Sequence, residues 1–152
     1  IRYPSGKGEM KDWRNEMQVL PIGKGKKLCD GDDIAVLSIG PIGNEVIKAI
    51  EMVKEEGVSI AHYDMIYLKP LDEELLHEIG QKYNRIITVE NGVIKGGFGS
   101  AVLEFMADNG YTPHVKRIGV PDAFIEHGSI PELYQLCGMD AESIAKQLKK
   151  EN

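Results

Sequence analysis

The alternation of short apolar runs with segments of helical periodicity is the feature that most constrains this fold. Residues 34–40 (IAVLSIG) form a nearly continuous aliphatic run, which is typical of a strand buried on both faces. Residues 44–57 then carry apolar side chains at helical spacing, with Asn44 as a possible N-cap and Gly57 where a helix would end. Strands that alternate with helices of this length predict βαβ units and a mainly parallel sheet with both faces covered.

The same alternation continues to the end of the chain. Residues 19–33 hold two short apolar pieces around Gly23–Gly25, which predict a β-hairpin or a sheet-edge strand. The later elements are expected, in chain order, at strand 58–65, helix 72–83, strand 85–90, helix 99–110, strand 114–120, a short helix near 130–138 and a last helix from Asp140. The sequence therefore predicts a three-layer α/β/α fold with a mostly parallel sheet of about five strands, one edge strand being antiparallel.

The chain divides into a linker and one domain. Residues 1–18 carry glycine, lysine and acidic side chains without periodicity, which indicates an interdomain linker. Residues 19–152 are expected to form an α/β domain. The chain opens with IRYPSGKG, without an initiator methionine or the layout of a signal peptide, so we interpret it as a piece of a longer protein.

Composition narrows the class of function. A formal charge of −6 and a pI near 5.2 argue against a nucleic-acid partner. No apolar stretch approaches the roughly 18 residues that a membrane span needs, so a soluble protein without a membrane partner is expected. Cys29 and Cys137 belong to a domain large enough to fold without a disulfide, and we expect reduced thiols and a cytoplasmic location.

Residues 89–101 (VENGVIKGGFGSA) place four glycines between an expected strand and an expected helix. Such a segment can bind phosphate at the helix N-terminus, or it can let two backbones pack closely. The dinucleotide fingerprint needs G-x-G-x-x-G directly after the first strand, and a Walker loop needs G-K-[ST]; neither spacing occurs here. We therefore favour tight turns and close packing for Gly96 and Gly97, with phosphate binding as the alternative.

Candidate site residues follow the expected strands, because ligands of open parallel sheets gather at the carboxyl ends of the strands. Glu90 and Asp64 end two strands; we favour hydrogen bonding to loop amides, with an active-site or subunit contact as the alternative for each. His127 lies in the polar stretch PDAFIEHGS, where a titratable ring can face a cleft. Arg2 is either a solvated charge or a phosphate clamp.

The remaining motifs predict neither a metal site nor a complete catalytic set. His62 and His114 fall within strands and are expected in the core or at the sheet edge, and His77 is expected to be solvated on an acidic helix. The histidines lack metal-binding spacing, and the nucleophile-elbow pattern G-x-S-x-G does not occur.

Several phrases taken together resemble one family: RYPSGKG, VLSIGPIGN, YDMIYLKPLDEELL, ITVENGVIKGGFGSAVLEF and IGVPDAFIEHGS. They are similar to the C-terminal domain of the 1-deoxy-D-xylulose-5-phosphate synthases, which are thiamine-diphosphate-dependent relatives of transketolase. The resemblance extends from Arg2 to Lys146. Transketolase and the 2-oxoacid dehydrogenase β subunits share the general architecture, so their C-terminal domains are one alternative; a stand-alone small-ligand-binding module is another.

The resemblance implies a transketolase C-terminal-like fold and a share in a transferase reaction. Such synthases decarboxylate pyruvate and add the two-carbon unit to D-glyceraldehyde 3-phosphate, which supplies isoprene and thiamine biosynthesis. In the family, thiamine diphosphate and Mg²⁺ are held by the first domain, and the activating glutamate belongs to the second. The resemblance thus implies that this chain binds no cofactor, is inactive alone, and has as partners the N-terminal and middle domains and a homodimer mate.

One binding role carries over from the family to a matching position. The arginine of the R-Y-P phrase lies near the phosphate of the acceptor, which implies that Arg2 contacts the substrate and that Tyr3 orients the segment. The family usually reads R-Y-P-R-G, whereas Ser5 stands here in place of the second arginine, and Lys7 is the cation that can compensate. For four further residues the resemblance implies a place near a cleft or an interface, without a chemical step: Glu90, Gly96, Gly97 and His127.

Overall fold

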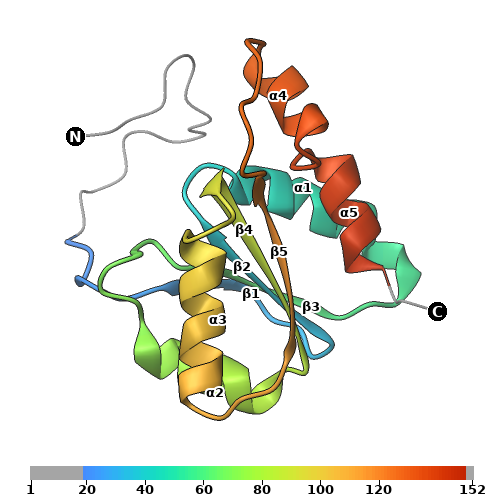
Figure 1. The fold of residues 1–152 in the computed structure, drawn as a ribbon. Helices are drawn as coiled ribbons and strands as arrows, with labels where there is room; N and C mark the ends of the chain where they lie inside the picture. The colour runs from blue at the N-terminus through green and yellow to red at the C-terminus, as the bar shows by residue number, and fades with distance from the viewer. Residues whose placement is uncertain (1–18, 150–152) are drawn as a thin grey trace.

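The computed structural model describes residues 19–149, and a five-stranded sheet of order β1-β3-β2-β4-β5 runs through its centre (Figure 1). Strands β2, β3, β4 and β5 run parallel to one another, whereas β1 runs antiparallel to β3. This arrangement confirms the predicted mostly parallel sheet with one antiparallel edge strand. The strands are β1 (Lys26–Cys29), β2 (Ile34–Ile39), β3 (Ile60–Asp64), β4 (Arg85–Val93) and β5 (His114–Val120).

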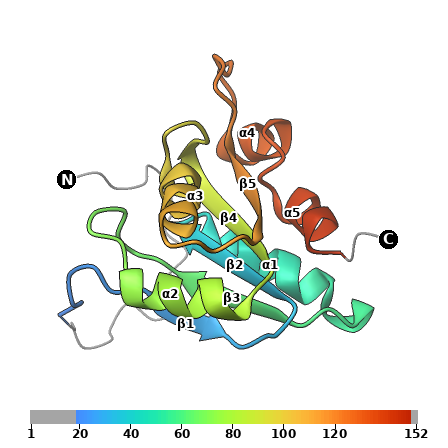
Figure 2. The ribbon, with the colours of Figure 1, turned by 60° about the horizontal axis from the view of Figure 1, so that its bottom comes forward.

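Helices cover both faces of the sheet. Helices α1 and α5 lie together on one face, and α2 and α3 lie on the other, so that the domain has three layers (Figures 1 and 2). Helix α4 lies beyond the carboxyl end of β5, and a short 3₁₀ turn, η1, follows α1. The helical elements are α1 (Gly43–Met52), η1 (Lys54–Glu56), α2 (Glu73–Lys82), α3 (Phe98–Asp108), α4 (Ile130–Leu136) and α5 (Ala141–Leu148).

Strand β2 shows why the chain needs helices on both sides. Successive side chains of a strand point to opposite faces, and here both directions are apolar and buried. Ile34 and Val36 belong to the core cluster on the α1 and α5 side, and Ala35 and Leu37 belong to the cluster on the α2 and α3 side. Two separate apolar cores therefore hold the sheet between its helices.

Asp72 ties the start of α2 to the edge of the sheet. Its carboxylate accepts hydrogen bonds from the backbone amides of Leu75, at 3.2 Å, and Gly25, at 2.9 Å. Burial opposes ionisation, but these amides and nearby Lys24 outweigh it and lower the pKa of Asp72. Lys24 also pairs with Glu74. The residues that lead into β1 are thus fastened to α2 by a capping carboxylate.

Three local predictions are wrong. Asn44 does not cap α1: the N-cap is Ile42, and no side chain supplies the capping hydrogen bond. The fourth strand does not end at Glu90, because β4 continues to Val93 and pairs there with β5 after an irregularity. His77 is half-buried rather than solvated, since its Nδ1 lies 2.9 Å from the hydroxyl of Tyr111 and its ring packs on Phe105.

Candidate functional site

The carboxyl ends of the parallel strands lie at the same end of the sheet. The loops after β2, β4 and β5 and the start of helix α3 lie together there (Figure 1). Ile39 of β2 lies beside Glu90 of β4 in the sheet register. The glycine segment, residues 91–97, leads from this point into α3. This edge is where an open α/β sheet would bind a ligand.

Glu90 is buried at this edge, with 5% of its surface exposed, and its side chain turns toward helix α3. Its Oε2 accepts a hydrogen bond from the backbone amide of Phe98, and its Oε1 accepts one from Gly99, both at 2.8 Å. The N-cap residue of α3, Gly97, has no side chain of its own to fill this role. A carboxylate from β4 therefore satisfies two amides that the helix start leaves without partners. The favoured prediction for Glu90, a carboxylate hydrogen-bonded to backbone amides, is confirmed, but these amides belong to the start of α3 and not to the loop.

Two glycines next to Glu90, Gly97 and Gly119, make room for its side chain. A Cβ on Gly97 would lie 2.2 Å from Oε2 of Glu90 and 2.4 Å from the carbonyl oxygen of Val93. A Cβ on Gly119, in β5, would lie 3.0 Å from Cγ of Glu90. Gly96 serves differently: its φ is +70°, a left-handed conformation that glycine adopts without strain, and space around it is open. Close approach explains Gly97, and turn conformation explains Gly96.

Arg117 fastens the same segment from the neighbouring strand. Its Nη1 donates to the carbonyl oxygen of Ile94 and to the hydroxyl of Ser100, both at 2.8 Å. The Ser100 hydroxyl in turn accepts a hydrogen bond from the amide of Gly96, at 3.0 Å. The aliphatic part of Arg117 lies against Gly99, where a Cβ would come within 2.9 Å. Residues 91–100 are therefore held by an internal network of charges and amides.

This network bears on the choice between phosphate binding and packing. An anion at a helix N-terminus is bound by the free amides and by the positive end of the helix dipole. At α3, the amides of Phe98 and Gly99 already donate to Glu90. A phosphate there would have to displace a buried carboxylate or share its negative field. The geometry supports packing as the role of the glycine segment.

The other residues predicted as site candidates make no contact with Glu90 that the structure shows. Asp64 Oδ1 accepts a hydrogen bond from the amide of Ile66, at 3.1 Å, and so closes a local turn after β3. His127 is exposed in the loop between β5 and α4. Arg2 and Tyr3, together with the expected linker 1–18, lie outside the described residues.

A buried serine–histidine pair lies between β2 and β3. His62 Nε2 is 2.8 Å from the hydroxyl of Ser38, and both residues are 1% exposed. Burial lowers the pKa of His62 to about 4, because the charged ring would lose its hydration. His62 is therefore a neutral core residue, as its position within a strand predicted.

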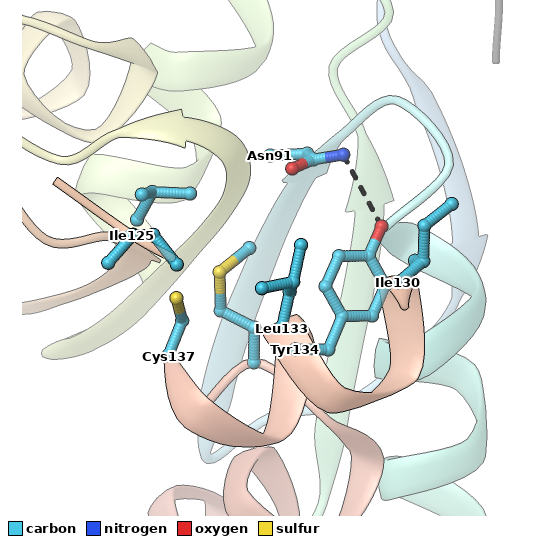
Figure 3. A pocket seen from close by; sticks show the side chains of 8 residues that line it. Asn91, Ile125, Ile130, Leu133, Tyr134 and Cys137 are labelled. Carbon is cyan, nitrogen blue, oxygen red and sulfur yellow. Dashed lines mark hydrogen bonds between the residues drawn. The ribbon is translucent and has the colours of Figure 1, made fainter. Parts of the chain in front are cut away.

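A pocket of about 190 Å³ opens beside the carboxyl ends of β4 and β5, under α4 (Figure 3). The amide of Asn91 donates to the hydroxyl of Tyr134 at 3.3 Å, and this is the polar end of an otherwise apolar lining. Sequence reasoning missed this pocket, although residues 130, 133, 134 and 137 share one helical face and could have signalled it. Its lining consists of Asn91, Val120, Ile125, Ile130, Leu133, Tyr134, Cys137 and Met139.

The described residues do not fit the metal–diphosphate group that the resemblance implies for the larger enzyme. Within residues 19–149, no three His, Cys, Asp or Glu side chains are grouped so that they could hold a metal ion. The N-terminus of α3, which follows the glycine segment, is already occupied by the carboxylate of Glu90. Across the same range, no helix is long and apolar enough to cross a membrane.

Comparison with known proteins identifies the class to which this fold and site belong. The family model described as transketolase, C-terminal domain, matches residues 23–144. The chain therefore belongs to the transketolase C-terminal domain family.

The chain is also similar to individual proteins of known name. The chain is 98% identical, over all 152 residues, to 1-deoxy-D-xylulose-5-phosphate synthase of Parabacteroides distasonis, of which it covers 24%. It is 43% identical over 148 residues to the synthase of Syntrophotalea carbinolica, covering 97% of this chain and 23% of that protein. The chain thus spans about a quarter of the length of the curated relatives it matches.

Solved structures show the same fold. A chain described as split gene transketolase, inactive beta4 tetramer, superposes with a TM-score of 0.76 at 31% identity, covering 86% of this chain and 45% of that one. Transketolase of Campylobacter jejuni superposes with a TM-score of 0.60 at 13% identity, over 82% of this chain and 18% of that one. The second likeness concerns the fold alone.

Proposed function

We propose that this chain is the C-terminal domain of a 1-deoxy-D-xylulose-5-phosphate synthase, and that it supports the acceptor side of the active site rather than carrying the chemistry. The observation that carries the proposal is the 98% identity to a synthase of that name along the whole chain. The alternative of a C-terminal domain from transketolase itself is less well supported, because the likeness to the split gene transketolase is 31%.

The reaction proposed for the full-length enzyme condenses pyruvate with D-glyceraldehyde 3-phosphate and releases CO₂. Thiamine diphosphate, bound with Mg²⁺, would supply the electron sink for the decarboxylation. The described residues do not fit this group, so we assign its binding to the domains outside this chain and assign no chemical step to this one. The partners proposed are those other domains and a homodimer mate, in the cytoplasm.

Within this chain, Arg2 is the residue we assign to substrate binding. A guanidinium group binds phosphate through two parallel charge-assisted hydrogen bonds, so it suits the phosphate of the acceptor aldehyde. Tyr3 would orient the Arg2 segment.

Two assays test the proposal. The chain alone, mixed with pyruvate, D-glyceraldehyde 3-phosphate, thiamine diphosphate and Mg²⁺, should form no product; turnover would contradict the proposal. In the full-length synthase, Arg2→Ala should raise the KM for the phosphorylated aldehyde about 10- to 100-fold, the loss expected for hydrogen bonds to a charged group. Lys116→Ala, an exposed charge on β5, is the matched control and should leave this KM unchanged. An unchanged KM in Arg2→Ala would leave the domain a purely structural role.

A further inference from the structure

The sequence contains two asparagines that are directly followed by glycine, Asn91–Gly92 and Asn109–Gly110. In such a pair the backbone nitrogen of the glycine can attack the side-chain carbonyl carbon of the asparagine and close a succinimide ring. Glycine favours this attack, because it has no side chain that hinders the approach and because its backbone rotates with little strain. The surroundings of each pair decide whether the two atoms can meet.

Asn91 and Gly92 lie in an irregular part of β4, at the carboxyl end of the sheet. The pairing of β4 with β2 ends before these residues. On the other side, β4 has three residues between Val89 and Val93, where β5 has Gly119 alone. Within the strands that the structure describes, neither Asn91 nor Gly92 has a partner in the register of the sheet. The extra residues of such a bulge lie outside the regular ladder, so their peptides are less restrained than those of the paired residues.

The side chain of Asn91 is exposed and weakly held. Its Nδ2 donates to the hydroxyl of Tyr134 at 3.3 Å, which is beyond the usual length of such a hydrogen bond (Figure 3). This contact involves the amide nitrogen, which is the leaving group, and not the carbonyl carbon that is attacked. Because the side chain is exposed, water can also reach it, as the hydrolysis of a succinimide requires.

The second pair is held at the end of a helix. Asn109 is the C-cap of α3, and its Nδ2 donates to the carbonyl oxygen of Phe105 at 2.9 Å. The attacking nitrogen is engaged as well, because the backbone amide of Gly110 donates to the carbonyl oxygen of Ala107 at 3.1 Å. Both hydrogen bonds must break before the ring can close, and this slows the reaction by about tenfold or more. The fold therefore distinguishes two pairs whose sequences are alike.

We propose that Asn91–Gly92 is a site of spontaneous covalent modification. The backbone nitrogen of Gly92 forms a bond to Cγ of Asn91, and the bond from Cγ to the side-chain nitrogen breaks. That nitrogen leaves as ammonia and takes the proton of the Gly92 amide. Water then opens the succinimide at one of its two carbonyl carbons and gives aspartate or isoaspartate. The reaction needs no other reactant, and the inference does not depend on the function proposed above.

Either product changes the carboxyl end of the sheet. The new carboxylate adds a negative charge next to Glu90, whose own carboxylate caps α3. A carboxylate has no donor, so the hydrogen bond that Asn91 donates to Tyr134 is lost. Isoaspartate also adds a carbon atom to the main chain before Gly92, which displaces the segment that leads to Gly97. We therefore expect isoaspartate to weaken the Glu90 cap more than aspartate does.

Ageing of the 152-residue chain in mildly alkaline buffer, followed by peptide mapping in a mass spectrometer, tests the proposal. The peptide with Asn91 should show exchange of NH₂ for OH, with oxygen-18 taken up from labelled water, and should separate into aspartate and isoaspartate forms. Its rate should exceed that of Asn109 by about tenfold or more. The rate should also rise with pH, because the attacking nitrogen must lose its proton. No modification at Asn91, or modification of Asn109 at an equal or higher rate, overturns the proposal.

Gly92→Ala tests the mechanism, since the added methyl group hinders the attack by the backbone nitrogen. We expect modification of Asn91 to slow by about tenfold to a hundredfold, the cost of a misplaced attacking atom. Asn109 is the internal control: an unchanged rate there shows that the variant is folded, because unfolding would release its hydrogen bonds. An unchanged rate at Asn91 in the folded variant contradicts the attack by Gly92. In the full-length synthase Asn91 should again react faster than Asn109, and the reverse order would also overturn the proposal.

Discussion

The carboxylate of Glu90 occupies the space that a side chain at Gly97 would need: a Cβ built on residue 97 would lie 2.2 Å from Oε2 of Glu90. The two residues come from a strand and from the cap of the following helix, and each explains the other. Glu90 supplies the negative charge that a helix N-terminus attracts, and Gly97 lets the backbone come close enough to receive it. The glycine segment is therefore closed by a residue of the chain itself.

Replacing Glu90 by glutamine should destabilise the domain. Glutamine keeps one acceptor, but its amide group would point a donor at the amide of either Phe98 or Gly99, leaving a buried donor without an acceptor. We expect Glu90→Gln to lower the free energy of unfolding by about 2–3 kcal/mol, measured by urea denaturation. Glu104→Gln, on the exposed face of α3, is the matched control and should change it by less than about 0.5 kcal/mol. Equal stability of the two variants would refute the capping role.

Gly97→Ala should have a comparable effect through a different cause. The added methyl group would meet the Glu90 carboxylate and the Val93 carbonyl oxygen, both on fixed elements, so the loop must shift. We expect a loss of about 2–3 kcal/mol in the free energy of unfolding, as is usual for overpacking. Gly128→Ala is the control, because the nearest atom to its Cβ would be the end of the flexible Leu133 side chain, at 3.2 Å. A Gly97→Ala variant as stable as Gly128→Ala would show that the close approach is dispensable.

His62 should make the stability depend on pH in mildly acidic solution. Its pKa is about 4 in the folded chain, whereas the ordinary pKa of histidine, which applies to the unfolded chain, is 6.5. Above pH 6.5 the ring is neutral in both states and contributes nothing. Between pH 6.5 and 4 the unfolded state binds the proton and the folded state does not, so stability falls as pH falls. The full loss, reached below pH 4, is about 3 kcal/mol.

The comparison of two variants isolates this effect. The free energy of unfolding of the natural chain and of His62→Gln is measured in urea at pH 7 and at pH 5. All other titratable groups are the same in the two proteins, so their contribution to the pH dependence cancels in the comparison. We expect the natural chain to lose more stability than His62→Gln between these two pH values. The same pH dependence in both proteins would mean that His62 does not titrate as its burial implies.

The sequence predicted the fold because its signals are local. The aliphatic run of β2 and the helical spacing of α1 each fit one kind of element, and their alternation permits few arrangements. Asp72 and Asp140 were readable as starts of helices for the same reason, and both cap their helices in the structure. The wrong prediction for Asn44 also has a local cause. Helix α1 begins directly after a turn in which the amides of Gly43 and Asn44 donate to the carbonyl oxygens of Gly40 and Pro41, so these amides need no side-chain cap.

The site was only partly predictable, because its decisive contacts join distant parts of the chain. The pattern around Glu90 indicated a carboxylate bonded to loop amides, but the cap it makes on α3 depends on how the segment folds back. The half-burial of His77 depends on Phe105 and Tyr111, which no helical pattern around His77 reveals. The pocket under α4 combines residues from β4, β5, α4 and the loop between β5 and α4, so only the fold brings them together.

The central claim is that Glu90 fills the anion-binding position at the start of α3, so that the glycine segment is a scaffold. Nuclear magnetic resonance of the nitrogen-15-labelled chain tests it most directly, by following the amide signals of Phe98 and Gly99 during titration with inorganic phosphate and with D-glyceraldehyde 3-phosphate. We predict that neither signal shows a saturable shift into the millimolar range. A saturable shift of both signals with either ligand would contradict the account.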